Sequence, residues 1–213
     1  MTRPPSRALP PHGPGLRVGL FGGSFNPPHE GHAAVVRLAL RRLALDAAWL
    51  LVSPGNPLKD ARELAPLALR LAQARGLTRD PRVRATAIEA ATGSRYSVDV
   101  ARYLMRRCPG TRFVWIMGAD SLASFHRWRR WREIARLMPI AVVDRPGSTL
   151  TFGGAPAGAF LARFRIDESR AARLAGMTPP AFVFLHGRRS QASSTALRAA
   201  RKKSFDPAPE LAS

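Results

Sequence analysis

Residues 16–32 read Leu-Arg-Val-Gly-Leu-Phe-Gly-Gly-Ser-Phe-Asn-Pro-Pro-His-Glu-Gly-His. The short apolar run over residues 16–21 is typical of a buried strand. Two glycines and two prolines interrupt it, and a long segment rich in apolar residues and arginine follows, so that a helix is expected over residues 29–45. This stretch therefore predicts a strand, a tight loop and a helix, and the rest of the chain is interpreted around it.

The loop has the composition of a phosphate-binding site. Gly22 and Gly23 allow a positive φ and let bare backbone approach an anion. The unpaired N–H groups at the start of the next helix would point at the same anion. A Gly-Gly turn between a strand and a helix also occurs in α/β proteins without a ligand, so the glycines leave both interpretations open.

Two histidines favour the ligand-binding interpretation. His29 and His32 are three residues apart and would lie on one side of the first helical turn, facing the loop. At the positive end of a helix dipole, with Gly31 between them, they are hard to explain as packing. A metal-binding pair is the alternative. It is disfavoured because such pairs prefer i, i+4 spacing with further ligands nearby, so we predict no protein-held metal site.

The other apolar runs predict a parallel sheet. A helix is expected over residues 64–76, with Leu67, Leu71 and Ala74 on one stripe and Gly76 as its end. Residues 89–95 are expected to form a loop, and residues 148–178 a loose loop with a short helix. The further predicted strands cover residues 47–53, 83–88, 112–117, 139–143 and 181–185.

This order of elements predicts an α/β fold: a single doubly wound, Rossmann-like domain with a mainly parallel sheet of five or six strands. Its ligand crevice would lie along the carboxyl ends of the first and fourth strands, where the strand order reverses. The length of 213 residues suits one such domain. We expect a disordered or draped arm over residues 1–15, the domain over residues 16–203 and a disordered tail over residues 204–213.

Composition narrows the class of protein. Cys108 is the one cysteine, which excludes an intramolecular disulfide and suits a reducing compartment. No apolar run approaches the roughly 20 residues of a membrane helix, so a cytoplasmic protein without a membrane partner is expected. The 34 Lys and Arg residues against 14 Asp and Glu give a net charge of +20, which suggests an anionic partner. Because the basic residues are spread through every segment, we predict no specific nucleic-acid partner.

A second candidate phosphate site lies near the end of the chain, at residues 193–198. Ser193, Ser194 and Thr195 precede an Ala-Leu-Arg sequence that begins a helix. Hydroxyl groups in this position are common N-caps. Together with exposed N–H groups and Arg198 one turn later, they would also suit a phosphate.

These two segments carry a resemblance to a known family. Residues 22–32 and the Ser-Ser-Thr-x-x-Arg pattern at 193–198 are similar to the motifs of the nucleotidyltransferase superfamily with a His-x-Gly-His signature. Within it, they resemble the nicotinate mononucleotide adenylyltransferases of bacterial NAD synthesis. The family usually has Asp where this chain has Asn26, a change that keeps an acceptor and removes a charge. The resemblance covers about residues 16–201.

The resemblance implies a reaction. ATP would give its adenylyl group to nicotinate mononucleotide, without a covalent enzyme intermediate, with Mg²⁺ held mainly through the ATP phosphates. His29, His32 and Arg198 would stabilise charge. The residues expected to bind ATP are Gly22, Gly23, Ser24, Phe25, Asn26, His29, His32, Gly118, Asp120, Ser193, Ser194, Thr195 and Arg198.

Asp120 and Ser97 each have a structural alternative. Residues 118–121 match the Gly-x-Asp-Ser element of the family, in which the acidic residue would accept hydrogen bonds from ribose hydroxyls. Ser97 preserves the hydroxyl of a family threonine beside the substrate carboxylate, within a stretch whose Arg95 and Val100 depart from the family pattern. From the residues alone, either could be only a helix N-cap.

Lys59 and Trp128 complete the predicted mononucleotide site. A lysine after a proline-rich loop meets the mononucleotide phosphate in the resembled family, and Lys59 follows such a loop. Trp128 stands where the family places a ring-stacking tryptophan, whereas Trp131 suits packing.

Three alternatives to this function stay open. They are a preference for nicotinamide mononucleotide in the same reaction, a pantetheine-phosphate adenylyltransferase or cytidylyltransferase of the same superfamily, and a noncatalytic nucleic-acid binder.

Overall fold

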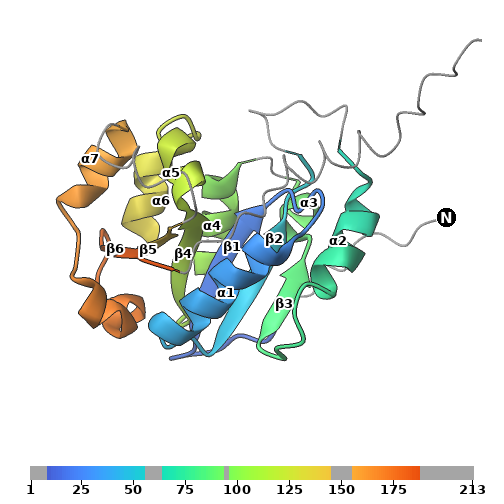
Figure 1. Cartoon of the computed structure of the whole chain (residues 1–213), viewed down its shortest axis with the longest axis horizontal. Helices are drawn as coiled ribbons and strands as arrows, with labels where there is room; N and C mark the ends of the chain where they lie inside the picture. The colour runs from blue at the N-terminus through green and yellow to red at the C-terminus, as the bar shows by residue number, and fades with distance from the viewer. Residues whose placement is uncertain (1–8, 56–63, 94–95, 145–154, 188–213) are drawn as a thin grey trace, which may run out of the picture.

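The computed structural model describes residues 9–55, 64–93, 96–144 and 155–187 (Figure 1). Within these ranges, the six predicted strands all form, with boundaries shifted by up to two residues. They are β1 (Arg17–Gly23), β2 (Ala47–Val52), β3 (Val83–Thr86), β4 (Arg112–Gly118), β5 (Ile140–Val143) and β6 (Phe182–Leu185).

The strands make one fully parallel sheet in the order β3-β2-β1-β4-β5-β6. The chain adds strands outward from β1 in one direction and then restarts at β4 on the other side. The order therefore reverses between β1 and β4, which confirms the predicted switch point. Phe21 of β1 is in register with Ile116 of β4, so the carboxyl ends of these two strands lie side by side.

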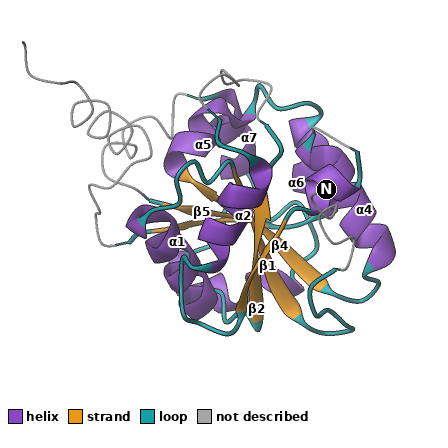
Figure 2. Cartoon of the chain, turned by 90° about the vertical axis from the view of Figure 1, so that its right-hand side faces the viewer, coloured by secondary structure: helices purple, strands orange, loops and turns teal. Residues whose placement is uncertain are grey.

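Helices cover both faces of the sheet (Figure 2). The helices are α1 (Glu30–Arg42), α2 (Leu67–Arg75), α3 (Ile88–Ala91), α4 (Ser97–Arg107), α5 (Ala119–Phe125), α6 (Trp131–Leu137), α7 (Pro156–Ala162) and the 3₁₀ helix η2 (Glu168–Gly176). One core layer lies between the sheet and α1, α2 and η2. The other lies between the sheet and α3 to α7. The doubly wound α/β architecture is confirmed.

Several predicted boundaries were wrong, and two of them were wrong because burial continues past the end of an element. The first helix ends at Arg42 rather than at residue 45, since Ala44 has a φ of +48° that no helix accommodates. Leu43 and Leu45 beyond it are nevertheless buried. Similarly, Ile88 is 1% exposed but begins α3 instead of ending a strand, so the expectation of a loop from residue 89 was wrong as far as Ala91. An apolar residue at the end of a run does not reveal which element buries it.

The segment expected to be a loose loop is more regular than predicted. Residues 145–154 lie outside the described residues, but α7 and η2 occupy most of the remainder. Both are short and rich in alanine, which explains the weak sequence signal. The described part of the predicted arm contacts the domain: the N–H of Gly15 donates to the carbonyl of Gly110 at 2.9 Å, and the hydroxyl of Thr111 donates to the carbonyl of Gly13 at 3.1 Å.

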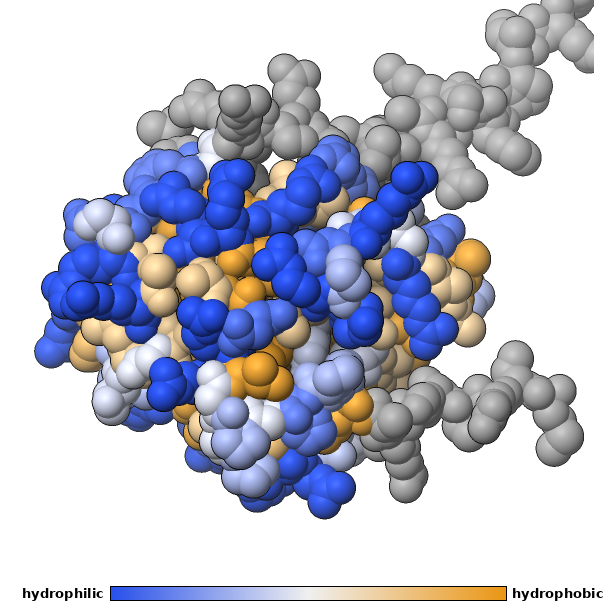
Figure 3. Space-filling view, turned by 90° about the horizontal axis from the view of Figure 1, so that it is seen from below, coloured by the Kyte–Doolittle hydropathy of each residue, from blue (hydrophilic) through white to orange (hydrophobic). Residues whose placement is uncertain are grey.

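The surface carries many arginines, several of which pair with acidic groups. The Arg17 guanidinium donates to the Asp46 carboxylate at 2.7 Å, and Arg82 and Asp80 do the same at 2.7 Å. Hydrophilic side chains are scattered over the face seen in Figure 3, with small apolar areas between them. None of the helices in the described ranges is both long and apolar enough to cross a lipid bilayer.

Candidate active site

The two predicted histidines form the N-terminal cap of α1. His29 is the N-cap residue and His32 lies in the first turn. The N–H of Gly31 donates to Nδ1 of His29 at 3.1 Å, and the N–H of His29 donates to Nδ1 of His32 at 3.2 Å. These bonds satisfy helix-end N–H groups that would otherwise have no partner inside the helix. Each imidazole therefore has a structural role as a helix cap, which the sequence analysis did not predict.

The same bonds fix the chemistry of the rings. A ring nitrogen that accepts a hydrogen bond carries no proton, so a neutral imidazole at either position bears its proton on Nε2. The side chains of Phe21 and Phe25 pack against the His32 ring, with centroids 6.0 and 4.9 Å away. His29 and His32 are 7% and 8% exposed. The cap and the aromatic contacts therefore orient two potential Nε2–H donors at the positive end of a helix.

The loop before α1 departs from the predicted geometry in one detail. Gly22 and Gly23 continue β1 without a positive φ, and the left-handed residue is Phe25, with a φ of +47°. The Phe25 ring is fully buried, and a Cβ atom added at Gly23 would lie only 3.3 Å from it. Gly23 therefore makes room for Phe25, which would meet a ligand only through its backbone. Because Gly22 and Gly23 have no side chains, the backbone at the carboxyl end of β1 is not covered by any side chain of its own.

The predicted ribose-binding residue lies across the switch point from this loop. Gly118 ends β4 and is the N-cap of α5, whose first turn contains Asp120. Asp120 is exposed. Because β1 and β4 are neighbours, the structure brings Gly22, Gly23 and Asp120 to the same edge of the sheet.

Ser97 and Trp128 belong to elements on one face of the sheet. Ser97 is the first residue of α4, whose N-cap is Tyr96, so the alternative interpretation of Ser97 as the N-cap was wrong. Trp128 follows α5 and is half-buried. The Phe125 and Trp115 rings pack edge-on against it, with centroids 5.3 and 6.3 Å away. These two contacts orient the indole. Trp131 is 6% exposed, which confirms its predicted packing role.

The remaining predicted site residues lie outside the described residues. They are Lys59, Ser193, Ser194, Thr195 and Arg198. Their roles stay predictions.

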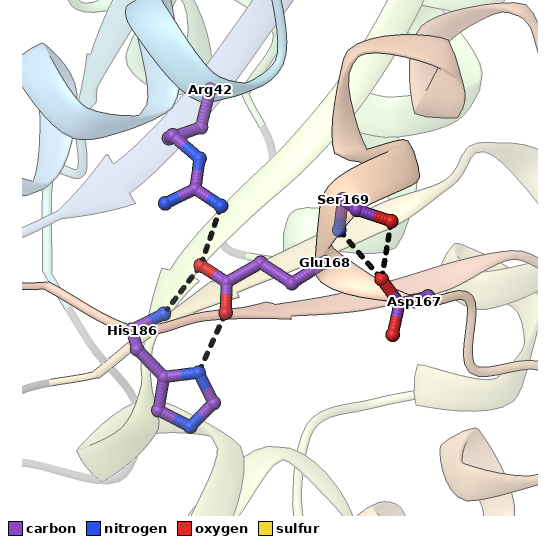
Figure 4. A network of polar contacts seen from close by, with 5 residues as sticks. All are labelled: Arg42, Asp167, Glu168, Ser169 and His186. Atoms are coloured by element: carbon purple, nitrogen blue, oxygen red, sulfur yellow. Dashed lines mark hydrogen bonds and ion pairs between the residues drawn. The ribbon is translucent and has the colours of Figure 1, made fainter.

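A polar network lies where the described chain ends, just after β6 (Figure 4). Glu168 of η2 accepts hydrogen bonds from the N–H of His186 at 3.1 Å and from Nδ1 of that residue at 2.7 Å, and it pairs with Arg42 at 3.0 Å. Burial acts to raise the pKa of Glu168, but the bonds from His186 and the charge of Arg42 outweigh it and lower the pKa. The network fixes the exit of the chain from β6.

Sequence analysis missed two buried charged residues at the carboxyl edge of β2 and β3. Arg70 is 1% exposed and Glu89 is 5% exposed. Burial raises the pKa of Glu89 to about 7. A signal for Arg70 was available, because position 70 lies on the same helical stripe as Leu67 and Ala74. A charged residue on an apolar helical stripe predicts a buried charge that has hydrogen-bond partners within the fold.

Comparison with known proteins assigns the chain to a family. Residues 20–200 match the family model described as Cytidylyltransferase-like, which spans both the histidine motif and residues 193–198. The chain belongs to this nucleotidyltransferase family. Within it, a protein of Methylorubrum extorquens named "Probable nicotinate-nucleotide adenylyltransferase" is 60% identical over 183 residues, which cover 86% of this chain and 99% of that protein.

Further nucleotidyltransferases of the family support the same grouping. Proteins of Mesorhizobium japonicum and Brucella abortus with the same name are 57% and 54% identical, and the matches cover 94% and 97% of their lengths. The chain is thus a member of the nicotinate-nucleotide adenylyltransferases. The fold is shared with the solved Plasmodium falciparum nicotinic acid mononucleotide adenylyltransferase in complex with NaAD, at a TM-score of 0.65 and 14% identity over 86% of this chain and 83% of the other.

Proposed function

We propose that this nucleotidyltransferase transfers the adenylyl group of ATP to nicotinate mononucleotide, which yields nicotinate adenine dinucleotide (deamido-NAD) and pyrophosphate. The observation that carries the proposal is near full-length identity of 52–60% to proteins named for this activity. It is supported by a histidine pair that caps α1 at the switch point of a parallel sheet, where such folds bind nucleotides.

ATP would lie across the carboxyl ends of β1 and β4. Its phosphates would meet the backbone of residues 22–26, the two Nε2–H groups and the hydroxyl-rich segment at residues 193–195. Its ribose would lie beside Asp120, which is exposed at the same edge. Backbone N–H groups and a helix N-terminus favour an anion at this place.

The second substrate would bind on the side of α4 and α5. Trp128 offers an indole held edge-on by Phe125 and Trp115, which suits a flat pyridine ring. Ser97 at the start of α4 would lie near the pyridine carboxylate, and Lys59 would meet the phosphate. These assignments follow from the match of these positions to the family pattern.

The chemistry needs no enzyme nucleophile. An oxygen of the mononucleotide phosphate would form a bond to the α-phosphorus of ATP in line with the bond that breaks, and pyrophosphate would leave with the electron pair. The attacking oxygen is already anionic, so the barrier lies in bringing anions together and in spreading negative charge. His29, His32 and Arg198 are assigned to that charge stabilisation.

Mg²⁺ would be held mainly by phosphate oxygens. The imidazole N–H and backbone N–H groups gathered at this edge bind anions, whereas Mg²⁺ prefers oxygen ligands. The Asp120 carboxylate at the same edge is assigned to the ribose. Among the described residues, no group of three or more His, Cys, Asp or Glu side chains is placed to hold a metal ion. When bound by phosphate oxygens, Mg²⁺ would offset their negative charge. A cytoplasmic location, expected from the single cysteine, belongs to the same proposal.

The test is product identification. Purified protein is incubated with ATP, Mg²⁺ and, in separate reactions, nicotinate mononucleotide, nicotinamide mononucleotide or phosphopantetheine, and each product is identified by mass. We expect nicotinate adenine dinucleotide as the main product and a higher kcat/KM for the acid than for the amide. Equal values would remove the acid preference, and product only from phosphopantetheine would overturn the proposal.

A further inference from the structure

Arg70 is a charged side chain enclosed by the fold. It lies in α2 and is 1% exposed, although arginine is almost never fully buried unless it has partners. Burial lowers the pKa of its guanidinium, which nevertheless stays protonated at neutral pH. Such a residue requires hydrogen-bond acceptors, and the structure provides four.

All four acceptors are backbone carbonyl groups, and they come from three separate segments of the chain. Nη1 donates to the carbonyls of Ser24 and Ser53, each at 2.7 Å. Nη2 donates to the carbonyl of Pro54 at 3.3 Å, and Nε donates to that of Ala65 at 2.7 Å. In the described part of the chain, no carboxylate pairs with Arg70. The guanidinium therefore acts as a connector of loops rather than as a member of an ion pair.

The connected segments are those that the proposed function uses. Ser24 belongs to the phosphate loop between β1 and α1. Residues 53–54 leave the carboxyl end of β2 and lead toward Lys59. A further bond supports the same junction, because the N–H of Ala65 donates to Oδ1 of Asn26 at 3.2 Å. Arg70 thus joins the proposed ATP-binding loop to both ends of the segment that contains the predicted mononucleotide contact.

Burying a charge only for stability is inefficient, since an apolar side chain of similar volume often serves as well. What arginine adds is a rigid fork with five N–H donors, which can hold several acceptors at fixed mutual positions. Lysine has one flexible ammonium group and cannot reach the same set of carbonyls. The arrangement therefore indicates a need for fixed geometry between the two loops.

We propose that Arg70 is a positioning residue that sets the distance between the two substrate-binding loops. This inference rests on the proposed function. Since the two substrates are anions that must be aligned for in-line attack, a small shift between the loops lowers the rate of the chemical step more than it lowers binding. Loss of Arg70 should then act chiefly on kcat.

The test compares Arg70→Lys and Arg70→Met with a matched control. Arg17→Met removes another bonded arginine, which begins β1 at the opposite edge of the sheet and whose partner Asp46 directly precedes β2. For each variant, the melting temperature is measured first, and kcat and both KM values are then measured well below it. We expect kcat to fall roughly 10- to 100-fold in both Arg70 variants, with smaller changes in KM, and to stay within about twofold in Arg17→Met.

A readout independent of activity accompanies the kinetics. Hydrogen exchange should become faster in residues 22–26 and 53–55 of Arg70→Lys, but not in Arg17→Met. A lowered melting temperature with unchanged kcat and unchanged exchange would overturn the positioning role. If wild-type protein forms no dinucleotide, the proposed function fails, and exchange in the two loops alone decides whether Arg70 joins them. If Arg70→Met does not fold, Arg70→Lys carries the comparison.

Discussion

The imidazole rings of His29 and His32 lie with their centroids 3.9 Å apart, and both rings accept backbone N–H groups of the same helical turn. The helix cap and the proposed phosphate site are therefore one structure. Any substitution of either histidine changes the cap as well as the site, so a useful experiment must separate the two effects.

His32→Ala should lower kcat by roughly 10²-fold or more, the usual effect of losing a preorganised charge-stabilising group. It should also cost about 1 kcal/mol of stability through the lost cap bond. Pyrophosphate release and chemical unfolding measure the two effects.

His32→Gln is the matched control for the cap. Glutamine at this position of a capping box can still accept the N–H of the N-cap residue. The free energy of unfolding should therefore stay near that of the wild type, while kcat remains low. Near wild-type turnover in either variant would refute the catalytic assignment of His32.

Trp128 and Trp131 should respond differently to replacement by alanine. Trp128→Ala should raise the KM for the mononucleotide roughly 10- to 100-fold, the value of one stacked base, with little change in the KM for ATP. Trp131 packs against Phe125 and Phe160 at centroid distances of 5.6 and 5.2 Å, so Trp131→Ala should mainly cost about 3–5 kcal/mol of stability. Steady-state kinetics for each substrate separates these outcomes, and an unchanged mononucleotide KM in Trp128→Ala would exclude stacking.

Asp120 is predicted to recognise the ribose of ATP. Asp120→Ala should raise the KM for ATP by about tenfold or more, because a hydrogen bond to a charged group is lost. The same reason predicts that wild-type protein discriminates between ATP and 3′-deoxy-ATP and that Asp120→Ala discriminates less. Equal discrimination by both proteins would place the ribose elsewhere.

Glu89 should make stability depend on pH. Burial raises its folded-state pKa to about 7, above its unfolded value, so the wild type loses stability as pH rises from the unfolded to the folded pKa. Glu89→Gln removes this loss. Relative to wild type, it should gain roughly 1–3 kcal/mol between about pH 5 and pH 8, measured by urea unfolding.

Asp46→Asn should change the pH dependence of stability in the opposite direction to Glu89→Gln. The hydrogen bond from Arg17 lowers the pKa of Asp46, so its stabilisation is present above the unfolded pKa and disappears as pH falls through the folded pKa. Asp46→Asn should thus be destabilising at neutral pH and less so in acid.

The outcome for Glu89 is read from the stability of Glu89→Gln relative to wild type. If this difference in stability does not change with pH, Glu89 keeps one charge state throughout.

The strands were predictable because each is a short, continuous apolar run that a two-sided parallel sheet requires. The ends of the elements were harder to predict from the sequence, because Leu45 and Ile88 are buried outside the elements to which periodicity assigned them. Alanine-rich α7 and the 3₁₀ helix η2 gave weak periodic signals. Their presence depends on packing against the finished sheet.

For the site, the motifs located His29, His32 and Asp120 at one edge of the sheet, which the topology confirms. Local sequence could not reveal that Phe25, rather than Gly22 or Gly23, has the positive φ, because a tertiary contact with the buried core fixes that residue. The loop-joining role of Arg70 depends on acceptors up to 46 positions away and so requires the folded structure.

We propose that the histidine motif and residues 193–198 bind the same polyphosphate. A crystal structure of the protein with Mg²⁺ and a nonhydrolysable ATP analogue tests this most directly. We predict that Nε2 of His29, Nε2 of His32 and the Arg198 guanidinium all lie within hydrogen-bonding distance of phosphate oxygens. A bound triphosphate that contacts the imidazoles while Arg198 lies on the opposite side of the molecule would contradict the claim.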